Sequence, residues 1–448
     1  MSENMNNEQE RRAARRKRRV RNQIMAYTVV GVLLIGLIVG GVLTGKYVMD
    51  KQKEQKQQEE LIAQIEEEII ESEEEEVILT EPESEPVVVE PTPEEKAEEI
   101  INEAIGVMSL EDKVAGLFIV TPESITGVST AVKAGDGTKE ALGKYAVGGL
   151  IYFSKNIQSE EQLTEMIANT TMWSKYPVFI GIDEEGGDVS RIANSSIEVA
   201  GVAAPAEIAA TGDAAQAYTA GTTIGGYLSK LGFNLDFAPV ADVATVDNQI
   251  LGDRAYGSDA ALVANFATSM VNGLQASGVS ACMKHFPGLG GTTKDTHDGM
   301  VSTERTKEEY QATEFPVYQQ GIAAGVDFIM VSHLCVPAIA GENIPSSLSP
   351  AVVTDVLRGE LGYDGIIISD AMNMAAITDY YAADQAAILA LRAGCDMILM
   401  PENFELAYQG ILDAVEEGTI AEERIDDALR RIYKVKLRDN IEAQLSGE

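Results

Sequence analysis

Short apolar runs alternate with longer stretches of helical character along the chain after Pro93. The runs are almost continuously apolar, which is typical of parallel strands buried on both faces. The stretches between them carry helix-start signals, such as Ser159 followed by Gln162, and Pro350 at a first helical position. The runs predicted as strands are residues 116–120, 148–153, 178–183, 234–240, 279–286, 327–334, 365–370 and 396–401.

Eight strand–helix units in succession predict an α/β fold, a (β/α)8 TIM-like barrel, over residues 100–448. The alternative is an open, doubly wound sheet. It is less favoured because no G-x-G-x-x-G motif follows the first apolar run.

A different apolar pattern lies near the start of the chain. Residues 22–45 carry no charge, and residues 24–43 are almost purely apolar. At ~1.5 Å per residue, such a helix spans a hydrocarbon core of ~30 Å. A buried core helix would be less apolar all round, and a cleaved signal peptide would have a shorter apolar region and a small-residue cleavage site. We therefore predict an uncleaved transmembrane anchor over residues 22–45.

The formal net charge of -37 is unevenly distributed. Residues 1–21 carry +5, residues 46–99 carry -15, and the remainder carries -27. The basic flank predicts a cytoplasmic N-terminus, and hence a single-pass protein of the cell membrane whose barrel domain is extracytoplasmic. Residues 46–99 are rich in Glu and Pro, which predicts a solvated stalk. Beyond the basic flank the chain is acidic and has no basic patch, which excludes nucleic acid as a partner.

Polar side chains gather where the predicted strands end. In a barrel these ends converge on one rim, where active sites form. A buried strand tolerates polar groups at its mouth only when they are paired or used. The alternative for Asp370 is a helix N-cap. The residues concerned are Asp183, Asp242, Lys284, His285, His333 and Asp370.

All three histidines, His285, His297 and His333, fall in this part of the sequence. Asp295 and His297 lie two residues apart in a Gly/Thr-rich loop, where a carboxylate can orient an imidazole for proton transfer. The alternative is a zinc site built from the three histidines and an Asp. No HExxH motif or matching ligand spacing is present, so we predict no metal and no cofactor.

Three basic residues, Arg191, Arg254 and Lys284, stand in acidic surroundings. They are candidate hydrogen-bond donors to a polyhydroxylated substrate, or else partners of the many carboxylates. The widely spaced Cys282, Cys335 and Cys395 lie in or beside predicted strands, which predicts buried free thiols rather than disulfides.

A series of motifs follows one another in order over residues 107–401. The motifs are MSLEDKVAGLF (108–118), IDEEGGDVSRI (182–192), LGFNLDFAPVADV (231–243), LGDRAYGSD (251–259), KHFPGLGG (284–291), DTHDG (295–299), IMVSH (329–333) and LGYDGIIISDAMNM (361–374). On these motifs the chain resembles glycoside hydrolase family 3, and within it the NagZ-like, single-domain bacterial β-N-acetylhexosaminidases that act on peptidoglycan fragments.

The resemblance implies a barrel that releases terminal β-linked N-acetylglucosamine from cell-wall-derived glycans with retention of configuration. On matching positions, Asp370 is the expected nucleophile, and His297, held by Asp295, is the expected general acid/base. The general scheme for these hydrolases would use a second carboxylate instead of this histidine. The sugar-binding set implied by the resemblance is Asp183, Arg191, Arg254, Lys284 and His285.

Two positions depart from the family pattern. Leu289 stands where the family usually has His, and Ala371 follows Asp370 where recycling members usually have a second Asp. Neither change removes a residue with an expected catalytic role, but both bear on the loop and the pocket. The alternatives are therefore a related β-glucosidase, a phosphate-using glycosidase, and a catalytically inactive sugar-binding barrel.

Overall fold

The computed structural model describes residues 91–247 and 250–446. The predicted flank, the transmembrane segment at 22–45 and the stalk up to residue 90 lie outside these residues. Within the described ranges, no helix has the length and apolarity needed to cross a membrane.

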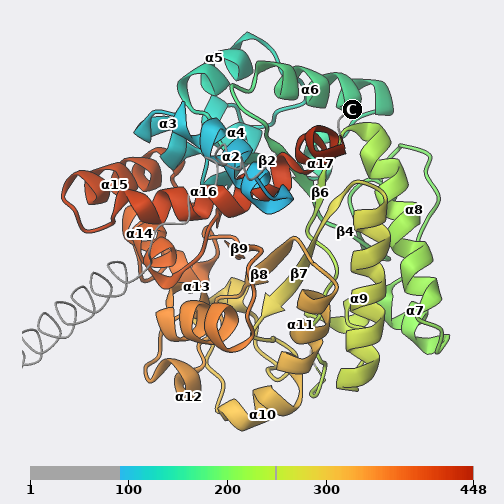
Figure 1. Cartoon of the computed structure of the whole chain (residues 1–448). Helices are drawn as coiled ribbons and strands as arrows, with labels where there is room; N and C mark the ends of the chain where they lie inside the picture. The colour runs from blue at the N-terminus through green and yellow to red at the C-terminus, as the bar shows by residue number, and fades with distance from the viewer. Residues whose placement is uncertain (1–90, 248–249, 447–448) are drawn as a thin grey trace, which may run out of the picture. The chain divides into compact units, whose positions relative to one another are not determined.

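Eight parallel strands form the centre of the domain (Figure 1). They are β1 (Phe118–Val120), β2 (Gly149–Ile151), β3 (Phe179–Ile182), β6 (Leu235–Asp236), β7 (Ser280–Phe286), β8 (Phe328–Val331), β9 (Ile366–Ser369) and β10 (Ile398–Leu399). Their order in the sheet is β10-β1-β2-β3-β6-β7-β8-β9. A parallel bridge between Ile368 and Met397 joins the two ends of this order, so the sheet closes into a barrel. The predicted barrel is confirmed, and the open sheet is not found.

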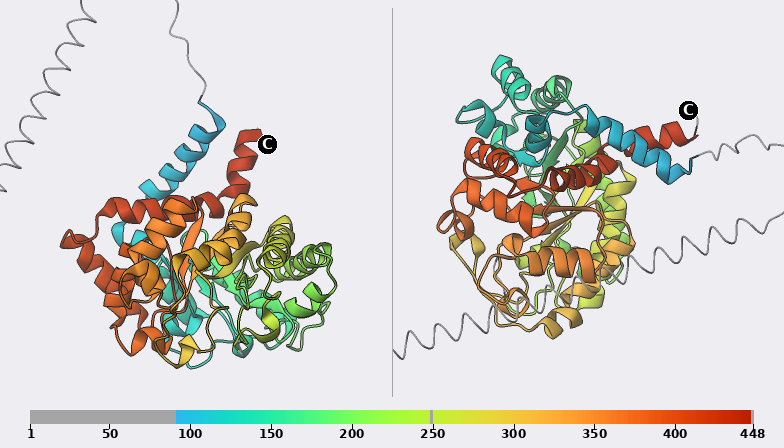
Figure 2. Two further views of the ribbon diagram at one scale, coloured as in Figure 1. Left: turned by 90° about the horizontal axis from the view of Figure 1, so that it is seen from below. Right: turned by 60° about the vertical axis from the view of Figure 1, so that its left-hand side comes forward.

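Helices surround the barrel, and those on its outside alternate with the strands along the chain (Figures 1 and 2). The outer helices are α5 (Asp136–Lys144), α6 (Glu160–Trp173), α8 (Ala215–Leu231), α9 (Ala260–Ala276), α11 (Glu314–Ala323), η5 (Ala351–Glu360), α14 (Ala383–Ala393), α15 (Phe404–Glu416) and α16 (Glu422–Lys436). The additional helices are α2 (Pro93–Gly106), α3 (Leu110–Ala115), α4 (Pro122–Thr126), η1 (Ser154–Asn156), α7 (Pro205–Ala210), η2 (Gly252–Arg254), η3 (Thr296–Asp298), α10 (Lys307–Ala312), α12 (Pro337–Ala340), η4 (Ser346–Leu348), α13 (Ala375–Thr378) and α17 (Arg438–Ser446).

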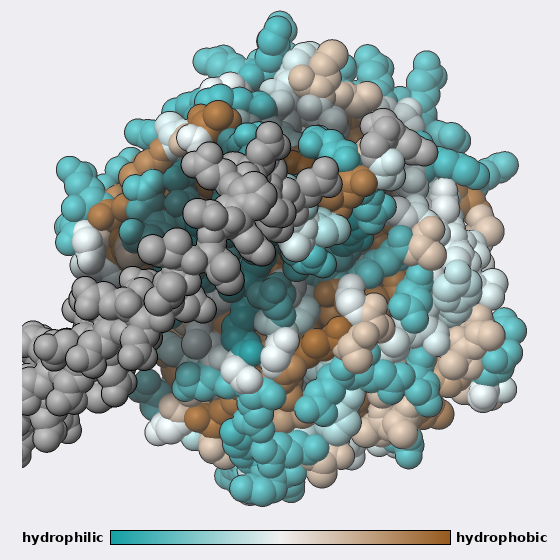
Figure 3. Space-filling model, viewed as in Figure 1, coloured by the Kyte–Doolittle hydropathy of each residue, from teal (hydrophilic) through white to brown (hydrophobic). Residues whose placement is uncertain are grey.

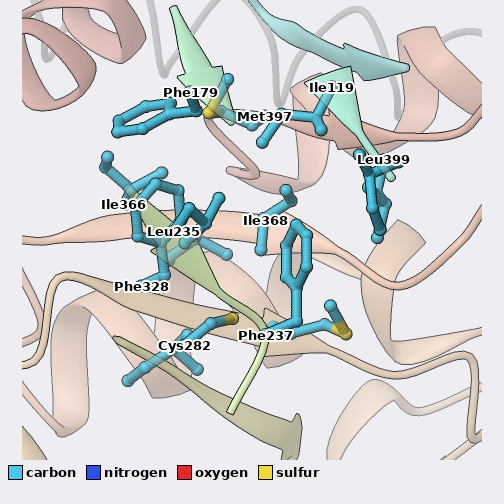
Figure 4. Packing of buried hydrophobic residues seen from close by; sticks show 14 of the residues in the cluster. Ile119, Phe179, Leu235, Phe237, Cys282, Phe328, Ile366, Ile368, Met397 and Leu399 are labelled. Atoms are coloured by element: carbon cyan, nitrogen blue, oxygen red, sulfur yellow. The ribbon is translucent and has the colours of Figure 1, made fainter. Parts of the chain in front are cut away.

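The interior of the barrel is filled by apolar side chains from the strands (Figure 4). Phe179 of β3 meets Phe328 of β8 edge to face, with ring centroids 5.0 Å apart. Gly181 leaves room for the Phe237 ring, because a Cβ at Gly181 would lie 2.8 Å from that ring. A filled interior confines any substrate site to the ends of the strands. The surface seen in Figure 3 is mostly hydrophilic, with scattered apolar residues.

Helices begin at both positions predicted from the start signals, but the first turn of each differs from the prediction. Ser159 Oγ accepts a hydrogen bond from the Gln162 amide at 3.2 Å, while the Gln162 side chain accepts one from the Gln158 amide at 2.8 Å. The reciprocal half of the capping box is therefore shifted by one residue. Pro350 occupies the N-cap of η5 rather than its first helical position, and η5 is a π-helix.

Helix α2 begins earlier than expected. Thr92 caps it, and its buried Ile101 and Ile105 join the main core. The predicted domain boundary at residue 100 thus lies inside this helix, whose first turns we had assigned to the stalk. Helices α2 and α17 lie beside each other at one end of the barrel (Figure 2). One depression at this end is lined by Ala97 of α2, by Ile441 of α17 and by residues directly before β8 and β9, among them Asp327. Helices α2 and α17 therefore lie at the end of the barrel where β8 and β9 begin.

Two further features concern segments near the strands. Cys282, Cys335 and Cys395 are buried free thiols, as predicted. A short antiparallel hairpin, β4 (Glu184–Gly186) with β5 (Val189–Ser190), follows β3 and was not predicted. It extends from the carboxyl end of β3 and carries residues of the site described next.

Candidate active site

One cavity of about 310 Å³ opens at the carboxyl ends of the barrel strands, and we call it the rim cavity. All eight side chains predicted as site residues line it, although they come from segments up to 187 residues apart in sequence. Apolar side chains complete its wall, together with Glu185, Lys294, Thr296 and Asn373. The eight are Asp183, Arg191, Arg254, Lys284, His285, Asp295, His297 and Asp370.

Lys284 is the buried centre of a charged cluster in this cavity. Its side chain is 3% exposed, and its Nζ lies 2.9 Å from Asp183 Oδ1 and 2.7 Å from Glu185 Oε1. Burial alone would lower the pKa of Lys284, but the two carboxylates raise it above its ordinary value. The ammonium therefore stays charged and holds Asp183 in place.

Glu185 links Lys284 to Arg254 and is not among the site residues predicted from the sequence. Arg254 donates two hydrogen bonds to it, from Nε to Oε2 at 2.7 Å and from Nη2 to Oε1 at 2.8 Å. Burial would raise the pKa of Glu185, but Lys284 and Arg254 lower it to about 2. The one available signal was its position two residues after the strand-end Asp183.

The β4–β5 hairpin presents Arg191 to the same cluster. Arg191 Nη2 lies 3.6 Å from Asp183 Oδ2, while its buried Nε has no hydrogen-bond partner in the described part of the chain. The segment that carries Arg191 is fixed by buried Glu184, whose carboxylate accepts the Ile192 amide at 2.8 Å and the Ala193 amide at 2.9 Å. Glu184 thus sets the direction from which Arg191 enters the cavity.

His285 is fixed by a buried carboxylate. Its Nδ1 lies 2.7 Å from Asp242 Oδ2, so the Nδ1–H donates to Asp242 and Nε2 is left for a substrate hydroxyl. Asp242 Oδ1 also accepts the Leu289 amide at 2.6 Å. Leu289, which replaces the usual family His, packs in a small apolar cluster with Val301 and Leu334.

Asp370 follows β9 and faces the cavity rather than capping a helix. The next helix, α13, begins at Ala375 with Met374 as its N-cap, so the capping alternative is wrong. Asp370 Oδ1 accepts the Ala371 amide at 2.7 Å. Burial would raise the pKa of Asp370, but the neighbouring His285 and that amide lower it below its ordinary value. The carboxylate is therefore ionised at neutral pH.

Buried His333 supports the segment that follows Asp370. Its Nε2–H donates to the Ala371 carbonyl at 3.0 Å, and its Nδ1 lies 2.8 Å from Ser347 Oγ. Burial lowers the pKa of His333, so the imidazole is neutral. His333 therefore positions the Asp370 segment and is not among the residues that line the rim cavity.

Asp295 and His297 form a pair on the loop after β7. Asp295 Oδ1 lies 2.7 Å from His297 Nδ1 and accepts the His297 amide at 2.8 Å. Burial would raise the pKa of Asp295, but these hydrogen bonds lower it. The His297 side chain is 65% exposed, so its Nε2 can exchange protons with substrate and water. Gly290 anchors the loop, because a Cβ there would lie 1.8 Å from the Val243 carbonyl oxygen.

The histidines do not share a metal site in this arrangement. His285 pairs with Asp242, His297 with Asp295, and His333 with Ser347 and Ala371. Over residues 91–247 and 250–446, no three His, Cys, Asp or Glu side chains are placed to hold a metal ion.

The TIM-like barrel and the side chains at the carboxyl ends of its strands together indicate the class of protein. An ionised carboxylate, an imidazole–carboxylate pair and a cluster of charged donors are the groups that a glycosidase needs: a nucleophile, an acid/base and hydroxyl-binding side chains. The family model for the glycosyl hydrolase family 3 N-terminal domain matches residues 109–435. The chain therefore belongs to glycosyl hydrolase family 3.

Several relatives share this family. A β-hexosaminidase from Stenotrophomonas maltophilia is 34% identical over 59% of this chain and 80% of its own length. β-Hexosaminidase A from Pseudoalteromonas piscicida is 31% identical over 67% of this chain. A solved family 3 β-N-acetylglucosaminidase from Paenibacillus sp. is 35% identical with a TM-score of 0.70, over 75% of this chain and 64% of its own. The chain spans about half the length of the Pseudoalteromonas protein (54%).

Proposed function

We propose that this protein is a retaining, exo-acting β-N-acetylhexosaminidase that releases terminal N-acetylglucosamine from cell-wall-derived glycans. One observation carries the proposal. The ionised Asp370, the Asp295–His297 pair and the charged cluster around Lys284 all line the same rim cavity. The β-hexosaminidase relatives support the sugar specificity.

The geometry supports a two-step reaction. In the first step the Asp370 carboxylate attacks the anomeric carbon and forms a glycosyl ester, while protonated His297 gives its Nε2 proton to the departing oxygen. In the second step neutral His297 takes a proton from water, whose oxygen attacks the anomeric carbon and releases Asp370. Asp183, Lys284, Arg254 and His285 hold the sugar hydroxyls through charge-assisted hydrogen bonds.

A panel of nitrophenyl glycosides tests this proposal. We expect the purified chain to release nitrophenol from the β-N-acetylglucosaminide faster than from the β-glucoside or β-xyloside, with β-configured sugar formed first. Each substrate should be assayed with and without inorganic phosphate. A rate that depends on phosphate, with sugar phosphate as product, would instead identify the phosphate-using relative. Absence of turnover on every substrate would leave the inactive sugar-binding barrel.

Replacing His297 with alanine tests its role as acid/base. We expect the turnover number to fall by about 10²–10⁴-fold for leaving groups of high pKa. The loss should be smaller for nitrophenol, which departs with less proton assistance. The pH–rate profile of the wild type should also contain an ionisation that is missing in His297→Ala. An unchanged profile in the variant would remove His297 from the mechanism.

We also propose that residues 22–45 anchor the protein in the cell membrane and that the barrel lies outside the cytoplasm. The uncharged apolar run and the basic flank support this. The full chain should stay with membranes after alkaline carbonate extraction, and external protease should digest the barrel in intact spheroplasts. Recovery in the soluble fraction, or protection from the protease, would contradict the proposal.

A further inference from the structure

A second depression of about 280 Å³ lies beside the rim cavity, and we call it the side recess. The recess and the rim cavity share Asn373 and Met400 as lining residues, so a ligand bound in one adjoins the other. Most of its wall is polar. The lining residues are Thr121, Glu123, Ser124, Asn373, Met400, Pro401 and Glu402.

The junction between the two spaces has two unusual features. Met400 has a left-handed backbone conformation with φ of 46°, which is uncommon for a residue with a side chain. Such a conformation persists only where the surrounding structure holds it in place. Ala371 lies in the cavity wall directly after Asp370, where a second Asp would place a carboxylate. Its methyl group adds no second carboxylate beside Asp370.

The recess is negatively charged. Glu123 and Glu402 line it, and none of its seven lining residues is a cation. Glu123 Oε1 accepts the Ala131 amide at 2.9 Å and Asn156 Nδ2 at 2.7 Å, and Lys155 Nζ lies 3.5 Å away. Burial would raise the pKa of Glu123, but these contacts lower it. Its buried Oε2 has no hydrogen-bond partner among residues 91–247 and 250–446.

We propose that the side recess is the subsite for the leaving group and that it selects leaving groups that carry a primary ammonium. The proposal deepens the proposed function and rests on it. The ring beyond the scissile bond must adjoin the cavity that holds the terminal sugar, and the recess adjoins it. The carboxylates of Glu123 and Glu402 favour a cation over an anion there, although Lys155 offsets part of the charge of Glu123. A glucosamine ring or an amine-bearing peptide could supply the ammonium.

Binding to an Asp370→Asn variant tests the subsite without turnover. The ligands are three disaccharides with N-acetylglucosamine β-1,4-linked to glucosamine, to N-acetylglucosamine or to N-acetylmuramic acid, measured by calorimetry below the pKa of the amine. We expect the glucosamine disaccharide to bind about three- to tenfold more tightly than the neutral one, and the muramic acid disaccharide to bind least tightly. The preference should weaken as salt is added. Equal affinities for the three disaccharides, together with no preference for the amine-bearing peptide described below, would overturn the proposal.

Two substitutions locate the preference. In Glu402→Gln, and in Glu123→Gln, which keeps the Oε1 acceptor, we expect the glucosamine preference to fall toward unity. The exposed Glu417→Gln, outside the recess at the end of α15, should keep it. Turnover of nitrophenyl N-acetylglucosaminide should be unchanged in Glu417→Gln, and in every variant the affinity for the neutral disaccharide is the reference for the preference. A preference that survives in both recess variants would overturn the proposal.

Two further ligands separate the sources of the ammonium. They are muramyl disaccharides bearing a peptide with and without a free side-chain amine. If only the peptide with the free amine is preferred, glucosamine is not the natural source of the ammonium. The preference for that peptide should then still be lost in Glu123→Gln and in Glu402→Gln. The proposed activity fails separately, through absence of nitrophenyl substrate turnover, while the binding comparison continues to report on the recess.

Discussion

Asp370→Asn is expected to lower turnover of the β-N-acetylglucosaminide by on the order of 10⁴-fold or more, because an amide cannot form the glycosyl ester. The fold should be retained, since the side chain keeps its shape and its oxygen can still accept the Ala371 amide. Steady-state kinetics gives the loss, and thermal unfolding checks the fold.

A matched control separates this effect from a general loss of charge. Asp379 is exposed, lies nine residues further along the chain and is not among the residues lining the rim cavity. Asp379→Asn should therefore keep wild-type kinetics. Near-native turnover in Asp370→Asn, with the control also active, would mean that the nucleophile is another group.

Glu185→Gln is expected to damage both stability and catalysis. The carboxylate is 1% exposed and pairs with two cations, so its neutralisation leaves Lys284 and Arg254 without their shared counter-charge. Loss of one member of such a buried network costs on the order of 3 kcal/mol. Displacement of the two donors should also reduce kcat/KM by up to about 10²-fold. Denaturant unfolding and steady-state kinetics measure the two effects.

The stability effect should depend on pH in a defined direction. The pKa of Glu185 in the folded protein is about 2, below its ordinary value of 4.5. A depressed pKa contributes stability that is fully present above the unfolded value and is lost as the pH falls toward 2. The stability difference between wild type and Glu185→Gln should therefore be largest above about pH 4.5 and shrink in acid. Asp188→Asn, at an exposed position in the same hairpin, should show neither effect.

The barrel could be predicted from the sequence because its strands are buried on both faces. A run such as residues 365–370 has no other stable environment in a soluble domain, and its length separates it from a helix. The polar residues at the ends of such runs then identified the rim. The paired segment is shorter than the apolar run in several strands, most clearly at residues 234–240, where the ladder covers only Leu235–Asp236. The apolar pattern reports burial, which continues past the regular ladder into a stretch that keeps only irregular pairing, such as the bond from the Cys282 amide to the Ala238 carbonyl.

Glu185 could not be recognised in the same way. The chain contains 71 acidic residues, and nothing local distinguishes the one that meets Lys284 and Arg254, which are 99 and 69 residues away. Its role arises only when β3 and β7 are brought to one rim. The side recess was hidden for the same reason, since Glu123, Asn373 and Glu402 come from segments after three different strands. A site built from distant loops depends on how the strands are arranged in the barrel. The local sequence pattern carries no information about that arrangement.

Helices α2 and α17 lie together at one end of the barrel, and the rim cavity lies at the other. Of the described residues, α2 and α17 lie near the starts of β8 and β9, whereas the rim cavity opens at the opposite ends of the strands. A tag, fusion partner or solid support joined at either helix therefore leaves the mouth unobstructed. Immobilised on a bead through these helices, the enzyme would present its mouth outward to insoluble polymers as well as to small sugars.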